Sequence, residues 1–287
     1  MSIAHEVEPL FTAPPLSCDC HFHVFGPAGR YPYGTDLRYP PPFAPLEEYL
    51  ALSRKLGFER FVFVQPSAYG RDNECMLEAM REAGAACRGI VDIDENIPDV
   101  QLERLHSAGV RGVRINVSPV KQPEPGFAAT MRPRIERLDA RCAEIGWQLD
   151  FLLPGWLTTE LMGVLRKLKT EFTLAHMGMF LARDGIQQPG FQQLLELLRS
   201  GNERCWVKLT GVYRMSIAPG FADAAPLAKA LIAAAPHRVI WGSDYPHLSF
   251  ADRVGSIELF NLLAQWAPDE AVRRRILVDN PQRLFKF

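Results

Sequence analysis

Four residues suited to acid–base or metal chemistry follow apolar segments of the sequence. His21 and His23 end the run LSCDCHFHV, His176 ends FTLAHMG, and Asp244 lies in RVIWGSDYPH. Histidines separated by one residue point to the same face of a strand. We therefore expect His21 and His23 to enter one site, although a lone HxH is also typical of two core histidines whose hydrogen bonds are satisfied.

Three imidazoles and one carboxylate allow two kinds of chemistry. A zinc ion takes about four N, S or O ligands, so a single zinc could be held by the whole set, His21, His23, His176 and Asp244. Without a metal, Asp244 could act as a general base while the histidines orient or polarise the substrate. The residue types alone leave both possibilities open.

Two arginines and a fourth histidine are placed to contact a substrate. Arg114 lies within VRGVRINV, and Arg214 follows CWVKLTG. A guanidinium binds a carboxylate through a forked pair of hydrogen bonds, so both side chains could bind an acid, and a surface ion pair is the alternative for each. His247 follows Asp244 by three residues, and we expect it to contact the substrate as well.

Eight short apolar runs must position these side chains. They begin near residues 16, 60, 87, 110, 147, 172, 205 and 238, and most end in Pro, Gly or Asp. Such runs are typical of parallel strands that are buried on both faces. Between them lie helical patterns: PLEEYLALSRKLG, NECMLEAMREAG, PDVQLERLHSAG, RPRIERLDARCAEIG, TTELMGVLRKLK, PGFQQLLELLRSG and ADAAPLAKALIAAAP.

Alternation of eight strands with helices predicts an α/β fold, the (β/α)8 TIM barrel, in which working residues lie at the carboxyl ends of strands. An open doubly wound sheet is the alternative, but its first strand is usually followed by a glycine-rich loop, and here HFHVFGP follows instead. We interpret residues 1–287 as one domain. We expect residues 1–15 to form an N-terminal arm and residues 26–46 to form a loop over the active-site face.

Composition excludes several classes of protein. The 287 residues contain 32 Lys+Arg and 33 Asp+Glu, a net charge of -1 without a dominant basic block, so we expect no binding to nucleic acid or an anionic membrane. No segment resembles a signal peptide or membrane span, and the six cysteines form no CxxC pair. We therefore expect a cytoplasmic protein of unknown oligomeric state. Motifs of nucleotide-binding proteins and serine hydrolases are absent from the sequence.

Several motifs together resemble the amidohydrolase superfamily, in the amidohydrolase-2 branch that contains 2-pyrone-4,6-dicarboxylate lactonases. The matching segments are DCHFHVFGP, LGFERFVFVQPSAYGRDN, AGVRGVRIN, AHMG, WVKLTGVYR, WGSDYPH and NPQRLF. The resemblance implies a hydrolase that opens a small carboxylate-bearing lactone with Asp244 as general base. It further implies that the catalytic group includes His21, His23 and His176, and that the substrate contacts are Tyr39, Ser67, Arg114 and Arg214.

Two departures from the lactonase pattern concern the substrate. The pattern has a second arginine six residues after Arg114, where this chain has Val120 followed by Lys121, and it has a tyrosine where this chain has Leu152. An arginine fork is selective for a carboxylate, so its loss should disfavour a second carboxylate on the substrate. We expect a monocarboxylate lactone to be preferred, unless Lys121 replaces the missing arginine.

The resemblance also bears on metal and on alternative activities. Binuclear members of the superfamily have a lysine on strand four and a histidine on strand five, whereas the candidates here are Arg114, Asn116, Gln148 and Asp150. The related lactonases imply that no metal is required, with one zinc as the alternative. Other activities considered are a sugar-acid lactone isomerase, a metal-dependent nonoxidative decarboxylase and a barrel that binds an acid without catalysis.

Overall fold

The eight expected apolar runs each contain a strand. The computed structural model describes residues 7–117 and 125–287, so Val120 and Lys121 lie outside the described residues. All neighbouring strands pair in parallel, in the order β1 to β8. Their bounds are β1 Cys18–Phe22, β2 Arg60–Val64, β3 Cys87–Val91, β4 Val110–Asn116, β5 Gln148–Leu152, β6 Phe172–Leu174, β7 Cys205–Leu209 and β8 Val239–Trp241.

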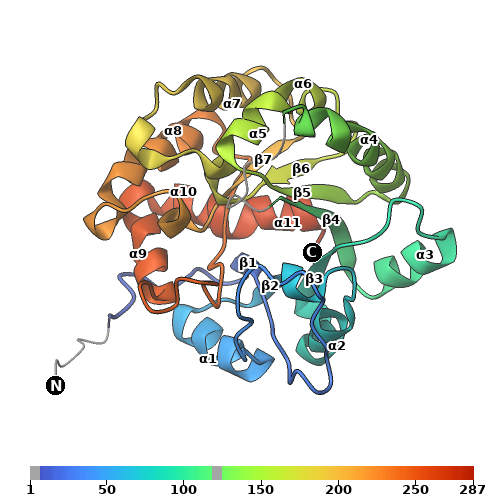
Figure 1. Cartoon of the computed structure of the whole chain (residues 1–287). Coiled ribbons are helices and arrows are strands. Elements are labelled where there is room, and N and C mark those ends of the chain that lie inside the picture. Colours follow the sequence, from blue (N-terminus) through green and yellow to red (C-terminus); the bar gives the residue numbers. More distant parts are fainter. Residues whose placement is uncertain (1–6, 118–124) are drawn as a thin grey trace.

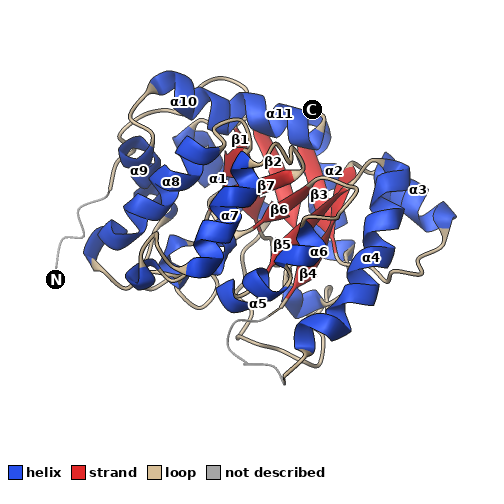
Figure 2. Ribbon diagram, turned by 90° about the horizontal axis from the view of Figure 1, so that it is seen from above, coloured by secondary structure: helices blue, strands red, loops and turns tan. Residues whose placement is uncertain are grey.

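The chain after β8 joins the first strand. The backbone N–H of Asp244 donates to the carbonyl oxygen of His21 over 2.8 Å, and the N–H of His23 donates to the carbonyl oxygen of Tyr245 over 2.8 Å. These bonds bring the two edges of the sheet together, and helices surround the strands in both views (Figure 1, Figure 2). The sequential strand order and this junction confirm the (β/α)8 barrel, because an open doubly wound sheet reverses its strand order.

Helices α1 to α8 lie at the positions of the seven patterns, and α9 to α11 follow β8. Their bounds are α1 Leu46–Leu56, α2 Glu74–Ala83, α3 Asp99–Ser107, α4 Phe127–Ile145, α5 Gly155–Glu160, α6 Met162–Leu165, α7 Pro189–Arg199, α8 Ala225–Ala234, α9 Ser256–Trp266, α10 Glu270–Arg274 and α11 Asn280–Phe285. The pattern TTELMGVLRKLK is divided between α5 and α6, because the backbone at Leu161 (φ -84°, ψ -2°) leaves regular helical geometry. No described helix is long and apolar enough to cross a membrane.

The C-terminal helix α11 covers the amino ends of the strands. Asn280 Nδ2 donates to the carbonyl oxygen of Val239 over 2.6 Å, and Arg88 Nε donates to that of Phe285 over 3.1 Å. Leu284 and Phe285 pack into the same buried cluster as residues of β1, β2, β3, β7 and β8. With this end of the barrel filled, the carboxyl ends of the strands are left to form the site.

Candidate active site

A cavity of about 750 Å³ opens at the carboxyl ends of the strands. Six of the residues expected from the sequence line it: Tyr39, Ser67, Arg114, His176, Arg214 and Asp244. The remaining wall is largely apolar and includes Leu152, Trp156, Phe180, Leu248 and Phe250. A concave apolar space with a few convergent polar groups is the usual form of a small-molecule site.

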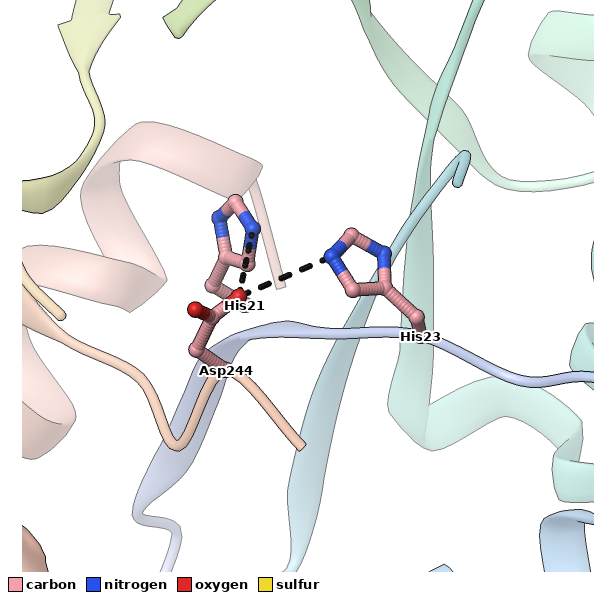
Figure 3. Close-up of side chains that lie close together, drawn as sticks. All are labelled: His21, His23 and Asp244. Atoms are coloured by element: carbon pink, nitrogen blue, oxygen red, sulfur yellow. Dashed lines mark ion pairs between the residues drawn. The ribbon is translucent and has the colours of Figure 1, made fainter. Parts of the chain in front are cut away.

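Asp244 is the centre of the polar group. Its Oδ1 lies 3.5 Å from His21 Nε2 and 3.6 Å from His23 Nε2, as Figure 3 shows, and its Oδ2 lies 3.8 Å from His176 Nε2. The four side chains are at most 2% exposed. The structure therefore brings together the three histidines and the aspartate that the sequence suggested, from β1 and from the segments after β6 and β8.

Each imidazole has a second contact on its other nitrogen. His23 Nδ1 donates to the carbonyl oxygen of Val64 over 2.7 Å. His176 Nδ1 lies 2.7 Å from Thr210 Oγ1, and His21 Nδ1 lies 3.3 Å from Lys208 Nζ. These contacts fix the ring orientations, which a site on a rigid scaffold requires.

Burial sets the protonation of the cluster. Desolvation lowers the pKa of His176 to about 3 and lowers those of His21 and His23 as well, so all three rings are neutral near pH 7. Burial opposes ionisation of Asp244, but the imidazoles, led by His176, and the Arg214 guanidinium outweigh that cost. The pKa of Asp244 consequently lies well below its usual range, and its carboxylate is ionised.

Local backbone geometry is unusual at the same place. His176 and Asp244 have left-handed backbone conformations, with φ of 52° and 58°. Such conformations cost energy in residues other than glycine and cluster at functional sites. Two glycines let the backbone approach the rings: a Cβ on Gly242 would lie 2.7 Å from His21 Cβ, and one on Gly211 would overlap the His176 ring.

Arg114 is a buried cation that faces the cavity. Its side chain is 4% exposed, and Nη1 donates to the carbonyl oxygen of Gln65. Nε has no hydrogen-bond partner, and no ion pair joins the guanidinium to a carboxylate in the part of the chain that the structure describes. Burial lowers the pKa of Arg114, an effect that Asp150 opposes. A buried cation without a counterion is costly, so the position is suited to an anionic ligand.

The sequence of the chain matches a known family over most of its length. The profile of the amidohydrolase family matches residues 18–287. The chain belongs to the amidohydrolase family. Among curated relatives, a 4-sulfomuconolactone hydrolase from Hydrogenophaga intermedia is 38% identical over 98% of this chain and 92% of the relative.

Two further relatives and one crystal structure also match this chain over most of its length. A 2-pyrone-4,6-dicarboxylate hydrolase from Comamonas testosteroni is 30% identical over 98% of this amidohydrolase and 94% of the relative. A D-galactarolactone isomerase from Agrobacterium fabrum is 31% identical over 94% of the chain and 90% of the relative. An apo crystal structure from Agrobacterium tumefaciens matches with a TM-score of 0.85 at 30% identity, covering 97% and 98% of the two chains.

Some residues that the sequence predicts as substrate contacts also bind other protein groups in the structure of this amidohydrolase. Arg214 Nε donates to Asp244 Oδ2 over 3.1 Å, so this arginine binds the aspartate as well as lining the cavity. Tyr39 OH lies 3.4 Å from Ser67 Oγ, which ties the loop of residues 26–46 to the segment after β2. His247 is not among the described lining residues: its Nε2 meets Ser256 Oγ over 2.8 Å.

Sequence reasoning did not single out several polar residues of the site. Tyr213 OH donates to Asp244 Oδ2 over 2.5 Å. Its position next to Arg214 in the sequence is the signal that could have identified it as a site residue. Lys208 was also missed: it forms an ion pair with Asp150, which the sequence had offered only as a strand-five residue in place of a metal-binding histidine, and both are fully buried. A lysine within the otherwise apolar strand CWVKL could have signalled this pair, because lysine is rarely buried without a partner.

A divalent cation would find ligand atoms at suitable spacing. The ligand atoms of His21, His23 and Asp244 lie within 4.8 Å of one another, the only such group of three or more in the described ranges 7–117 and 125–287. His21 Nε2 and Asp244 Oδ1 are buried without hydrogen-bond partners among the described residues. Spacing alone does not decide the fit, because a nitrogen that carries hydrogen cannot be a ligand.

Proposed function

We propose that this amidohydrolase hydrolyses a small lactone that carries an acidic group, with Asp244 as general base. The observation that carries the proposal is that the two oxygens of the Asp244 carboxylate have different surroundings. Oδ2 accepts from Tyr213 and Arg214, whereas Oδ1 is buried without a hydrogen-bond partner in the described structure, and Asp244 lines a cavity that is also lined by the buried cation Arg114. The relatives named for sulfomuconolactone and pyrone dicarboxylate support a lactone as the substrate class.

The reaction adds water across the ring ester. Asp244 Oδ1 takes a proton from water as the water oxygen attacks the lactone carbonyl carbon. The carbonyl oxygen becomes an oxyanion, for which the Arg214 guanidinium and an imidazole N–H are preorganised donors. The ring C–O bond then breaks, and the departing oxygen takes the proton from Asp244. The products are a carboxylic acid and a hydroxyl group on one open chain.

Substrate binding is assigned to other residues of the same cavity. Arg114 would bind the acidic group through a forked contact, with Tyr39 and Ser67 holding a ring or carboxyl oxygen. Trp156 and Phe180 offer apolar surface to the ring. A preference for one acidic group over two stays a sequence prediction, since Val120 and Lys121 lie outside the described residues.

We propose no required cofactor, with a single zinc held by His21, His23, His176 and Asp244 as the alternative. The isomerase relative makes lactone isomerisation the second candidate, in which a hydroxyl of the substrate replaces water as nucleophile. The proposed partner is a small anionic lactone, and the proposed location is the cytoplasm, where the six free, buried thiols would remain reduced.

Turnover with a panel of lactones tests the proposal. kcat/KM is measured for muconolactones with a carboxylate or sulfonate, for 2-pyrone-4,6-dicarboxylate and for sugar-acid lactones, before and after chelation. In H₂¹⁸O, hydrolysis places ¹⁸O in the product carboxylate, whereas isomerisation does not. The proposal predicts ¹⁸O incorporation that survives chelation. Absence of turnover across the panel, or activity lost on chelation and restored by zinc, would contradict it.

A further inference from the structure

A buried ion pair lies beside the histidines in the barrel interior. Lys208 Nζ on β7 forms an ion pair with Asp150 Oδ2 on β5, and both side chains are 0% exposed. Thr173 Oγ1 donates to the same Asp150 oxygen over 2.7 Å. Lys208 Nζ also lies 3.3 Å from His21 Nδ1. The lysine thus connects a structural carboxylate to one ring of the catalytic cluster.

The ionisation of this pair determines whether His21 Nδ1 donates or accepts in its hydrogen bond with Lys208. Burial would raise the pKa of Asp150, but the charges of Lys208 and Arg114 lower it below its usual range, so Asp150 is an anion and favours an ammonium at Lys208. An ammonium has three N–H donors and no lone pair. His21 Nδ1 must therefore accept. With the lone pair of Nδ1 facing the ammonium, the ring carries its hydrogen on Nε2.

We propose that Lys208, held by Asp150, is a positioning residue that fixes His21 with its hydrogen on Nε2. His21 is then a hydrogen-bond donor in the active site and not a metal ligand. This assignment deepens the proposed hydrolysis and rests on it for the role of the donor. The position of the hydrogen itself is independent of any substrate.

His23 has the opposite arrangement. Its Nδ1 faces the carbonyl oxygen of Val64, which only accepts, so Nδ1 carries the hydrogen and Nε2 carries the lone pair. Three atoms consequently face one another: the donor His21 Nε2 and the acceptors His23 Nε2 and Asp244 Oδ1, with Oδ1 lying 3.5 Å from His21 Nε2 and 3.6 Å from His23 Nε2. A water molecule matches this set: it accepts once, donates twice and keeps one lone pair for attack on the lactone carbonyl.

The same arrangement bears on zinc. A zinc ion bound at this position would need the lone pair of His21 Nε2, which requires moving the hydrogen to Nδ1, against the ammonium of Lys208. His23, His176 and Asp244 would be the ligands left. Removing the Lys208 charge should therefore increase the affinity for zinc while disturbing the water.

Nitrogen-15 NMR of the full chain labelled on histidine tests the assignment directly. Long-range ¹H–¹⁵N spectra distinguish ring nitrogens that carry hydrogen from those that do not. We expect His21 to carry it on Nε2 and His23 to carry it on Nδ1. Hydrogen on Nδ1 of His21 in the native protein would overturn the proposal, whether or not any lactone is turned over.

Variants provide the second test. Lys208→Met leaves the Asp150 charge buried and can prevent folding, so the double variant Asp150→Asn/Lys208→Met removes both charges. In the double variant we expect a mixture of His21 tautomers, kcat reduced at least about 10-fold with KM changed less than about 2-fold, and at least about 10-fold tighter binding of zinc alone. The Thr173→Val variant, which retains the ion pair, should leave the tautomer unchanged. Unaltered tautomer and zinc affinity in the double variant would refute a role for Lys208.

Discussion

Replacing Arg114 by methionine should weaken catalysis without weakening the fold. The guanidinium is 4% exposed and binds only one protein group in the described structure, the carbonyl oxygen of Gln65. In the absence of substrate, no carboxylate among the described residues forms an ion pair with it, so the cost of burying its charge is offset only in part, by the more distant Asp150. Methionine retains an unbranched side chain of similar length and removes the charge, so the folded protein loses one hydrogen bond and also that penalty.

The two effects differ in size. A hydrogen bond to a charged group contributes about 1.5–3 kcal/mol, and a forked contact with a substrate carboxylate contains two. At about 1.4 kcal/mol per tenfold change, kcat/KM for an anionic lactone should fall by at least about 100-fold. The free energy of unfolding should stay within about 1 kcal/mol of the native value or rise, because the lost bond to Gln65 and the relieved desolvation oppose each other.

Arg214→Met is the matched control in the same cavity. Arg214 is paired with Asp244, so its removal leaves a buried carboxylate with fewer partners and should lower both kcat and the free energy of unfolding. Urea unfolding and steady-state kinetics with an anionic lactone and its neutral methyl ester measure the effects. A loss of more than about 2 kcal/mol of stability in Arg114→Met, or equal losses of kcat/KM for acid and ester, would show that Arg114 is structural.

Four further predictions concern the catalytic group. Asp244→Asn removes the base and should lower kcat by about 100-fold or more with the circular dichroism spectrum unchanged; a normal kcat would mean that another group activates water. kcat should be constant between about pH 5 and pH 8 as far as His176 and Asp244 control it, because the pKa of His176 is about 3 and that of Asp244 lies well below its usual range; a fall towards acid with an apparent pKa near 7 would indicate zinc-bound water instead. His176 has a folded pKa of about 3 against 6.5 for the free side chain, so the unfolded state binds more protons and the free energy of unfolding, from urea titrations, should decrease as pH falls from 6.5 towards 3. Gly211→Ala places a Cβ against the His176 ring at a φ of 56° and should reduce both kcat and Tm; an unchanged Tm would show that the ring moves freely.

Much of this protein could be predicted from local pattern. Continuous apolar runs mark buried parallel strands, and the βα alternation places every carboxyl end on one face of the barrel. That rule is enough to group His21, His23, His176 and Asp244 from the sequence. It works because strand periodicity and barrel topology depend on the order of residue types along the chain.

Side-chain direction beyond the strand ends depended on the tertiary structure. His247 follows the same strand as Asp244, but its backbone has a φ of 60° and its ring meets Ser256, whereas Tyr213 binds the aspartate. Left-handed turns of this kind follow no periodicity, so no repeat in the sequence reports where the next side chain points. The pairing of Lys208 with Asp150 likewise joins β7 to β5 over the intervening strand β6, and such a contact exists only after these three strands have assembled into the curved sheet.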